Sequence, residues 1–89
     1  MDAAELDRIV AALKDAIAKA RVLAATDLAI GPGVRGVIRH AREMHDLFVE
    51  ALIANEPLAT VQYRGIAGAT GNAIGELEAL VARADGKID

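Results

Sequence analysis

The chain has 89 residues, no cysteine and a formal net charge of −3. This composition excludes disulfides, thiolate metal sites and thiol nucleophiles, and it lacks the basic excess of proteins that bind nucleic acid without regard to sequence. No apolar run reaches about 18 residues, so no transmembrane helix is indicated, and the acidic N-terminal segment does not have the pattern of a signal peptide. We therefore expect one cytoplasmic domain over residues 1–89 that does not span a membrane.

The apolar content is unusual in kind. Hydrophobic residues make up 54% of the chain, yet Phe48 and Tyr63 are its only aromatic residues. The remaining apolar mass is aliphatic and rich in alanine, which buries little area per residue. A chain of this length buries only about 60–65% of the surface that its unfolded form exposes. The core is therefore modest, and the composition favours a homo-oligomer, with a second protein partner also compatible.

Residues 3–29 are predicted to form a first amphipathic helix. Asp2 is the predicted N-cap, with Glu5 three residues later as in a capping box. The sequence Gly31-Pro32-Gly33 then marks a break. The apolar positions recur at steps of three and four, at Leu6, Ile9, Val10, Leu13, Ile17, Ala20, Leu23 and Ala24. This pattern indicates a packing or dimerisation helix and no chemistry.

Residues 34–55 are predicted to form a second helix, with its bases before its acids. Its apolar stripe comprises Val34, Val37, Ile38, Ala41, Met44, Phe48, Ala51 and Leu52, and its charges are Arg35, Arg39 and Arg42 followed by Glu43, Asp46 and Glu50. The order runs against the helix dipole. We hypothesise that two copies pack antiparallel about a twofold axis, each basic half against the other's acidic half. A solvated face without a partner is the alternative.

The second helix also holds the residues that an enzyme would need. Glu43, His45, Asp46 and Glu50 suggest a metal-dependent hydrolase built on a helical bundle. However, only this helix offers ligands, and metal sites in bundles require several facing helices. The chain contains no serine and no cysteine as a nucleophile. We predict no catalytic residue, no metal and no cofactor, and the hydrolase stays an alternative.

Residues 58–84 are predicted to form the third segment, after Asn55, Glu56 and Pro57 separate it from the second. Asn55 or Glu56 is its predicted cap, and Gly86 is its predicted stop. Its middle contains four glycines, at 65, 68, 71 and 75. Each costs about 1 kcal/mol relative to alanine inside a helix. Either the helix breaks here, or the glycines allow another backbone to approach closely.

If the helix breaks, the segment resembles a helix-turn-helix motif. Ala67 would pack the first helix, Gly71 would hold the turn, and Leu77 would seat the second helix. This resemblance implies a DNA-binding regulator. Glu76 and Glu78 would then lie where acidic side chains repel phosphate, which counts against DNA.

If the helix continues, the glycines form a ridge of small residues. The members fall at steps of three and four and are Gly65, Gly68, Gly71 with Asn72, and Gly75, and Ala79 continues the ridge. Such a ridge lets a second helix pack closely, within the chain or between subunits. Tyr63 is a candidate interface anchor. The apolar stripe beside the ridge comprises Ile66, Ala69, Thr70, Ala73, Leu77 and Leu80.

Three segments of similar length with short loops favour the continuous helix. The sequence therefore predicts an all-α, up-down-up three-helix bundle that is oligomeric, with the first and third helices forming the core and the second contributing charged contacts. The predicted function is a non-enzymatic adaptor or assembly protein. The predicted interface residues are Arg35, Arg39, Arg42, Glu43, Asp46, Glu50, Tyr63, Gly65, Gly68 and Gly75.

Overall fold

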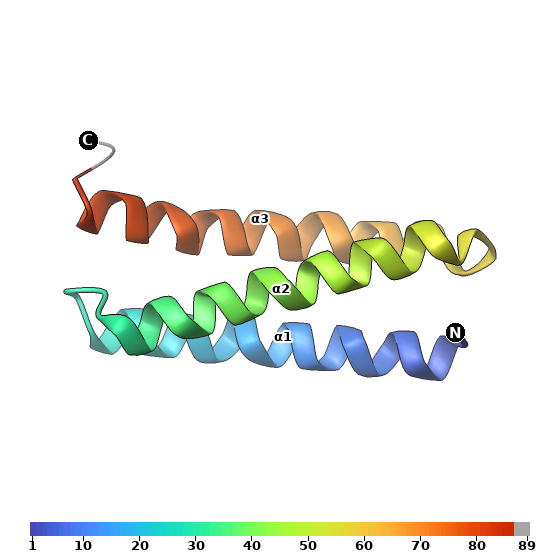
Figure 1. Cartoon of the computed structure of the whole chain (residues 1–89), viewed down its shortest axis with the longest axis horizontal. Helices are drawn as coiled ribbons and strands as arrows, with labels where there is room; N and C mark the ends of the chain where they lie inside the picture. The colour runs from blue at the N-terminus through green and yellow to red at the C-terminus, as the bar shows by residue number, and fades with distance from the viewer. Residues whose placement is uncertain (87–89) are drawn as a thin grey trace.

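The computed structural model of the protein describes residues 1–86. It contains three long α-helices, α1 (Ala3–Thr26), α2 (Pro32–Ala54) and α3 (Val61–Ala84), and one short 3-10 helix, η1 (Glu56–Leu58). No β-strand occurs within these residues, so the predicted all-α class with three main helices is confirmed. Figure 1 shows the helices side by side, with the α1–α2 connection at one end of the molecule and the α2–α3 connection at the other.

The helix ends follow local capping chemistry. Asp2 is the N-cap of α1 as predicted, and its carboxylate accepts a hydrogen bond of 2.8 Å from the Glu5 amide. The helix ends at Thr26, three residues earlier than predicted. The cause is Asp27, whose carboxylate accepts the amide of Gly31 at 2.9 Å and closes a turn that the periodicity does not report.

The α1–α2 turn also carries backbone strain. Ile30 has a φ of +53°, in the left-handed region that β-branched residues avoid. Three interactions hold it there: its amide donates to the Asp27 carbonyl at 3.1 Å, its carbonyl accepts the Arg35 Nε at 2.7 Å, and its side chain is buried. Burial of the Ile30 side chain in the core offsets the strained backbone.

The start of α3 differs from the prediction. Glu56–Leu58 turns as η1, and α3 begins at Val61, because the hydroxyl of Thr60 caps it by accepting the Tyr63 amide at 3.3 Å. The predicted cap at Asn55 or Glu56 is therefore wrong, since a hydroxyl residue further along captures the free amides. At the other end, Gly86 has a φ of +71° and stops the helix as predicted, whereas residues 87–89 lie outside the described residues.

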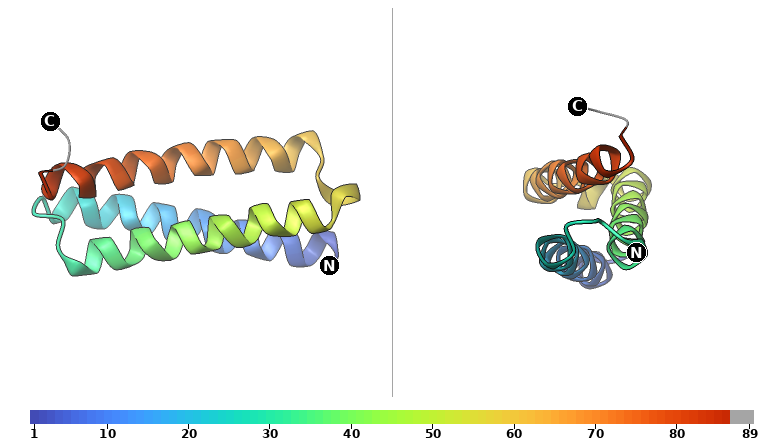
Figure 2. Two further views of the ribbon diagram at one scale, coloured as in Figure 1. Left: turned by 45° about the horizontal axis from the view of Figure 1, so that its top comes forward. Right: turned by 90° about the vertical axis from the view of Figure 1, so that its left-hand side faces the viewer.

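The core runs along the inner face of α2. The end-on view of Figure 2 shows α2 against both other helices. The buried apolar residues are Leu6, Val10, Leu13, Ala16, Ile17, Ala20 and Ala24 of α1, Ile30 of the turn, Val34, Ile38, Ala41, Phe48, Ala51 and Leu52 of α2, and Ile74 and Leu77 of α3. The expectation that the first and third helices form the core is wrong, because the stripe of α2 is buried as deeply as that of α1.

Phe48 is the largest fully buried side chain. Its ring lies edge-on to Tyr63, with the ring centroids 6.3 Å apart. Replacing it with alanine should lower the free energy of unfolding by about 3 kcal/mol or more, because no neighbouring side chain fills the cavity. Urea denaturation followed by circular dichroism measures this loss. Val22→Ala, at an exposed position on α1, is the control and should change stability by less than about 0.5 kcal/mol; an equal loss in both variants would contradict the assignment of the core.

Candidate interaction surfaces

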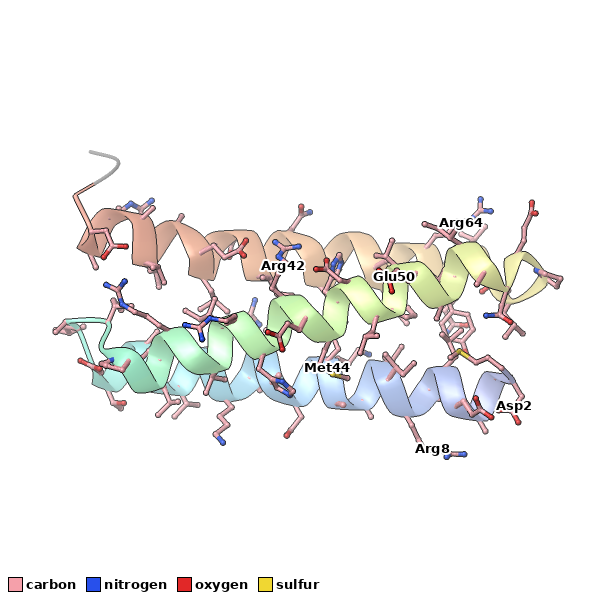
Figure 3. The ribbon with its side chains drawn as sticks, viewed as in Figure 1. Asp2, Arg8, Arg42, Met44, Glu50 and Arg64 are labelled. Atoms are coloured by element: carbon pink, nitrogen blue, oxygen red, sulfur yellow. The ribbon has the colours of Figure 1, made fainter. Side chains whose placement is uncertain are left out.

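Two ion pairs join α2 to α3. Arg42 makes a bidentate pair with Glu78, with Nε at 3.1 Å from Oε2 and Nη2 at 2.6 Å from Oε1, and Figure 3 shows Arg42 extending from α2 toward α3. The hydrogen bonds from Arg42 lower the pKa of the Glu78 carboxyl below its ordinary value, against the opposing effect of burial. Arg35 pairs with Asp85 in the same bidentate manner, at 2.8 and 3.1 Å. These pairs set the rotation of α3 about its axis.

Tyr63 joins α3 to both other helices. Its hydroxyl donates to the Asp7 carboxylate of α1 at 2.5 Å, and its ring contacts Phe48 of α2. The hydrogen bond to Asp7, and burial to a smaller extent, raise the pKa of the Tyr63 phenol. The structure therefore gives Tyr63 a role inside the chain, where the sequence suggested an interface anchor.

These contacts weaken the hypothesis of antiparallel α2–α2 pairing. Of its three cations, Arg35 and Arg42 are engaged with α3 of the same chain, and only Arg39 has no such pair among the described residues. The α2 stripe that the charges flank is also buried within the chain. The sequence pattern could not show this, since the partners of Arg35 and Arg42 lie 50 and 36 residues away.

The acids of the second helix remain exposed. We define the α2 outer face as Arg39, Glu43, Asp46, Leu47, Glu50 and Ile53, all of which are exposed. Leu47 and Ile53 expose 52% and 76% of their surface. Large aliphatic side chains beside a row of carboxylates make this face amphipathic.

His45 lies at the α2–α3 contact. Its Nε2 is 2.9 Å from the Ala67 carbonyl oxygen; since a carbonyl only accepts, Nε2 carries the proton and donates. The Nδ1 atom is buried without a hydrogen-bond partner in the described part of the chain. The ring rests on Gly71, where a Cβ would lie 3.0 Å from Nε2 and 3.3 Å from Cε1. Gly71 is thus the glycine of α3 that the chain's own packing requires.

The residues of the hydrolase alternative do not converge. His45 points to α3, whereas Glu43, Asp46 and Glu50 are exposed on the α2 outer face. Within residues 1–86, no group of three histidine, aspartate or glutamate side chains is arranged to hold a metal ion. That alternative required His45 and the three acids to meet at one point, and helix geometry turns His45 toward α3 while the acids share the outer face.

The other glycines of α3 face outward. We define the outer ridge of α3 as Val61, Gly65, Gly68, Asn72, Gly75 and Ala79, which recur at steps of four and three. Gly65, Gly68 and Gly75 are exposed, and a Cβ on any of them would meet nothing within 4 Å. The interpretation of these three as a packing seam within the chain is therefore wrong. Since α3 is continuous from Val61 to Ala84, the turn that a helix-turn-helix requires is also missing.

A groove separates α1 from α3 on the side away from α2. One stretch of about 490 Å³ is floored by Ala24, Leu77 and Leu80, and a second of about 300 Å³ continues from it past the shared Arg21 and Ala73. Lys14, Arg21 and Arg83 lie along this groove together with Glu76. We call it the α1–α3 groove. The sequence did not predict it, since its walls come from two helices whose relative rotation only the tertiary structure fixes.

Comparison with known proteins identifies no relative. No protein-family model, curated protein or solved structure gave a significant match to this chain. Across the described residues, no helix combines the length and apolar character that crossing a bilayer requires.

The Arg42–Glu78 pair makes stability depend on pH. Because the pKa of Glu78 is lowered on folding, its ionisation stabilises the fold above the ordinary carboxyl pKa, and this contribution disappears as the pH falls through the lowered value. We expect Glu78→Gln to lower the free energy of unfolding by about 0.5–1 kcal/mol at neutral pH, a small value because both side chains are partly exposed. The loss should shrink progressively as the pH falls through the lowered pKa of Glu78. Urea titrations over a series of pH values measure it. Glu76→Gln removes an exposed carboxylate of the same helix that takes no part in this ion pair, so it is the control and should change stability by less than about 0.5 kcal/mol. For Glu78→Gln, a loss at neutral pH that persists unchanged in acid would contradict the role of the ion pair.

The two kinds of glycine in α3 can be separated by matched substitutions. Gly75→Ala should raise the free energy of unfolding by about 1 kcal/mol, through helix propensity alone. The free energy of unfolding of Gly71→Ala should be at least about 1 kcal/mol below that of Gly75→Ala, because the new methyl group displaces His45 from its hydrogen bond. Thermal or urea denaturation of dilute protein measures both. Equal gains would show that Gly71 is not under steric constraint.

Proposed function

We propose that this chain is a small, non-enzymatic assembly protein: an up-down-up three-helix bundle that acts through self-association and contacts with other proteins. The observation that carries the proposal is the outer ridge of α3. It presents three glycines and no charged residue along an exposed helix face.

Helix propensity gives the first argument. Gly65, Gly68 and Gly75 each destabilise α3 by about 1 kcal/mol relative to alanine, and nothing in the chain occupies the space that a Cβ would take. The chain's own packing therefore gives no reason for glycine at these positions. A second helix against the ridge supplies one, since glycine positions without side chains let two backbones approach and gain dispersion contacts.

Periodicity gives the second argument. The ridge positions follow steps of four and three from Val61 to Ala79, the spacing that keeps one face of a helix against a partner helix over several turns. A solvated face normally carries charged residues, whereas this one has Asn72 as its only polar side chain. An uncharged ridge can be buried in an interface without desolvating an ion.

The remaining features agree with this proposal. An aliphatic core with one large buried aromatic residue gains stability when a subunit covers more of the surface. The absence of cysteine fits a reducing compartment, and we place the protein in the cytoplasm.

Substitution of the ridge tests the proposal. Wild-type protein should show a mass that rises with concentration in sedimentation velocity. Gly68→Leu should raise the dissociation constant by about tenfold or more, because the side chain separates the backbones, while circular dichroism stays unchanged since the site is open within the chain.

Gly36→Leu is the matched control. Gly36 lies in α2, also with no atom within 4 Å of a Cβ, and its substitution should leave association unchanged. A wild-type protein that stays monomeric up to millimolar concentration would overturn the proposed function. An unaffected Gly68→Leu oligomer would remove the ridge as its basis.

A further inference from the structure

The α1–α3 groove differs in charge from the molecule as a whole. Three cations, Lys14, Arg21 and Arg83, lie along it against the single carboxylate of Glu76, while the chain has a net charge of −3. Its floor is aliphatic, with Leu77 and Leu80 at one end and Ile17 toward the other. A groove of this kind fits an amphipathic helix that presents aliphatic side chains between acids.

The α2 outer face has this chemistry. Glu43 and Glu50 are seven residues apart on α2, and Lys14 and Arg21 are seven residues apart on α1. In an α-helix both separations correspond to about 10.5 Å along the axis, two turns on one side. The exposed Leu47 lies between the two acids, where it would meet the aliphatic floor. Charge sign, spacing and apolar content therefore match.

These four charged residues are also free of competing partners in the part of the chain that the structure describes. Both ion pairs found there use other residues, Arg35 with Asp85 and Arg42 with Glu78. Like several other surface charges, the cationic pair in the groove and the anionic pair on α2 therefore have no ion-pair partner within the described residues. An intermolecular contact is required to join them, because α2 lies on the far side of the bundle from the groove (Figure 2).

We propose that the α1–α3 groove of one molecule binds the α2 outer face of a second copy. This inference rests on the proposed function of self-association and adds a contact whose groove shares only Ala79 with the outer ridge. Because the two surfaces differ, the contact is heterologous and leaves a free groove at one end and a free α2 face at the other. Growth continues beyond a dimer, into a ring if the rotation closes and into an open chain if it does not.

Charge reversal with complementation tests the contact. The groove variant combines Lys14→Glu with Arg21→Glu, and the face variant combines Glu43→Lys with Glu50→Lys. Each should raise the dissociation constant for growth beyond the dimer by about tenfold or more, because like charges then face each other. The equimolar mixture should recover the wild-type mass. A protein carrying all four substitutions should recover it too, with its formal net charge unchanged. The readout is sedimentation velocity over a range of protein and salt concentrations.

The matched control is Arg8→Glu with Lys19→Glu. It makes the same charge change on the same helix at exposed positions outside the groove, and it should assemble as the wild type does. Circular dichroism checks that every variant is folded. Added salt should weaken the wild-type assembly, since the paired charges lie at the rim of the contact.

The outcomes separate the two proposals. If wild-type protein stays monomeric, self-association fails and this contact fails with it. If wild-type protein assembles and both variants assemble equally well, self-association stands and the groove–α2 contact is overturned, as it would be if the groove served an acidic helix of another protein. Loss in both variants without recovery in the mixture also overturns it, because the two surfaces would then not bind each other.

Discussion

Burial of the apolar stripe on α2 is the constraint on which the rest of the structure depends. Phe48 is the only large aromatic residue in the core, and the buried residues of α1 are aliphatic, with alanines such as Ala16 and Ala20 among them. Small residues let two helices approach closely, so α1 and α2 cover each other well. Because that contact takes most of the buried surface, α3 places only Thr70, Ile74 and Leu77 among the buried residues. Two surfaces therefore stay open: the groove beside α1 and the outer ridge of α3.

The charged residues divide according to whether the chain satisfies them. Arg35 and Arg42 bind carboxylates on α3 and fix the rotation of that helix, which an aliphatic contact alone specifies poorly. The acids of α2 and the cations of the α1–α3 groove have no such pairing within the described residues. The first set explains how one molecule folds, and the second set supports our proposal of how molecules meet. The order of bases before acids on α2 did not distinguish these two roles in the sequence. The i,i+4 spacing identifies neighbours on one helix, but it does not identify ion-pair partners on another helix.

The glycines of α3 make the same distinction at the level of the backbone. Gly71 is required within the chain, because the ring of His45 occupies the space of a Cβ. Gly65, Gly68 and Gly75 have no such neighbour. They lower the stability of α3, and no contact within the chain compensates for that loss. All four glycines recur at steps of three and four residues in α3. Because an α-helix rotates by about 100° per residue, Gly71 nevertheless faces α2, whereas the other three face outward. We interpret glycines at exposed helix positions, where a Cβ would meet no atom of the chain, as a sign that another molecule packs there.

The sequence by itself determined the class, the number and most of the extent of the helices, because the three- and four-residue recurrence of apolar residues and the breaks at Gly31 and Pro57 are local signals. It also determined the Asp2 cap and the stop at Gly86. It did not determine the ends at Asp27 and Thr60, where single side chains capture backbone amides. Only the tertiary structure decided that the buried face of α2 packs against both other helices, that Arg42 faces Glu78, and that the cations of α1 and α3 line one groove. These features depend on how the helices are rotated against one another, and that rotation is set by contacts between residues far apart in the chain.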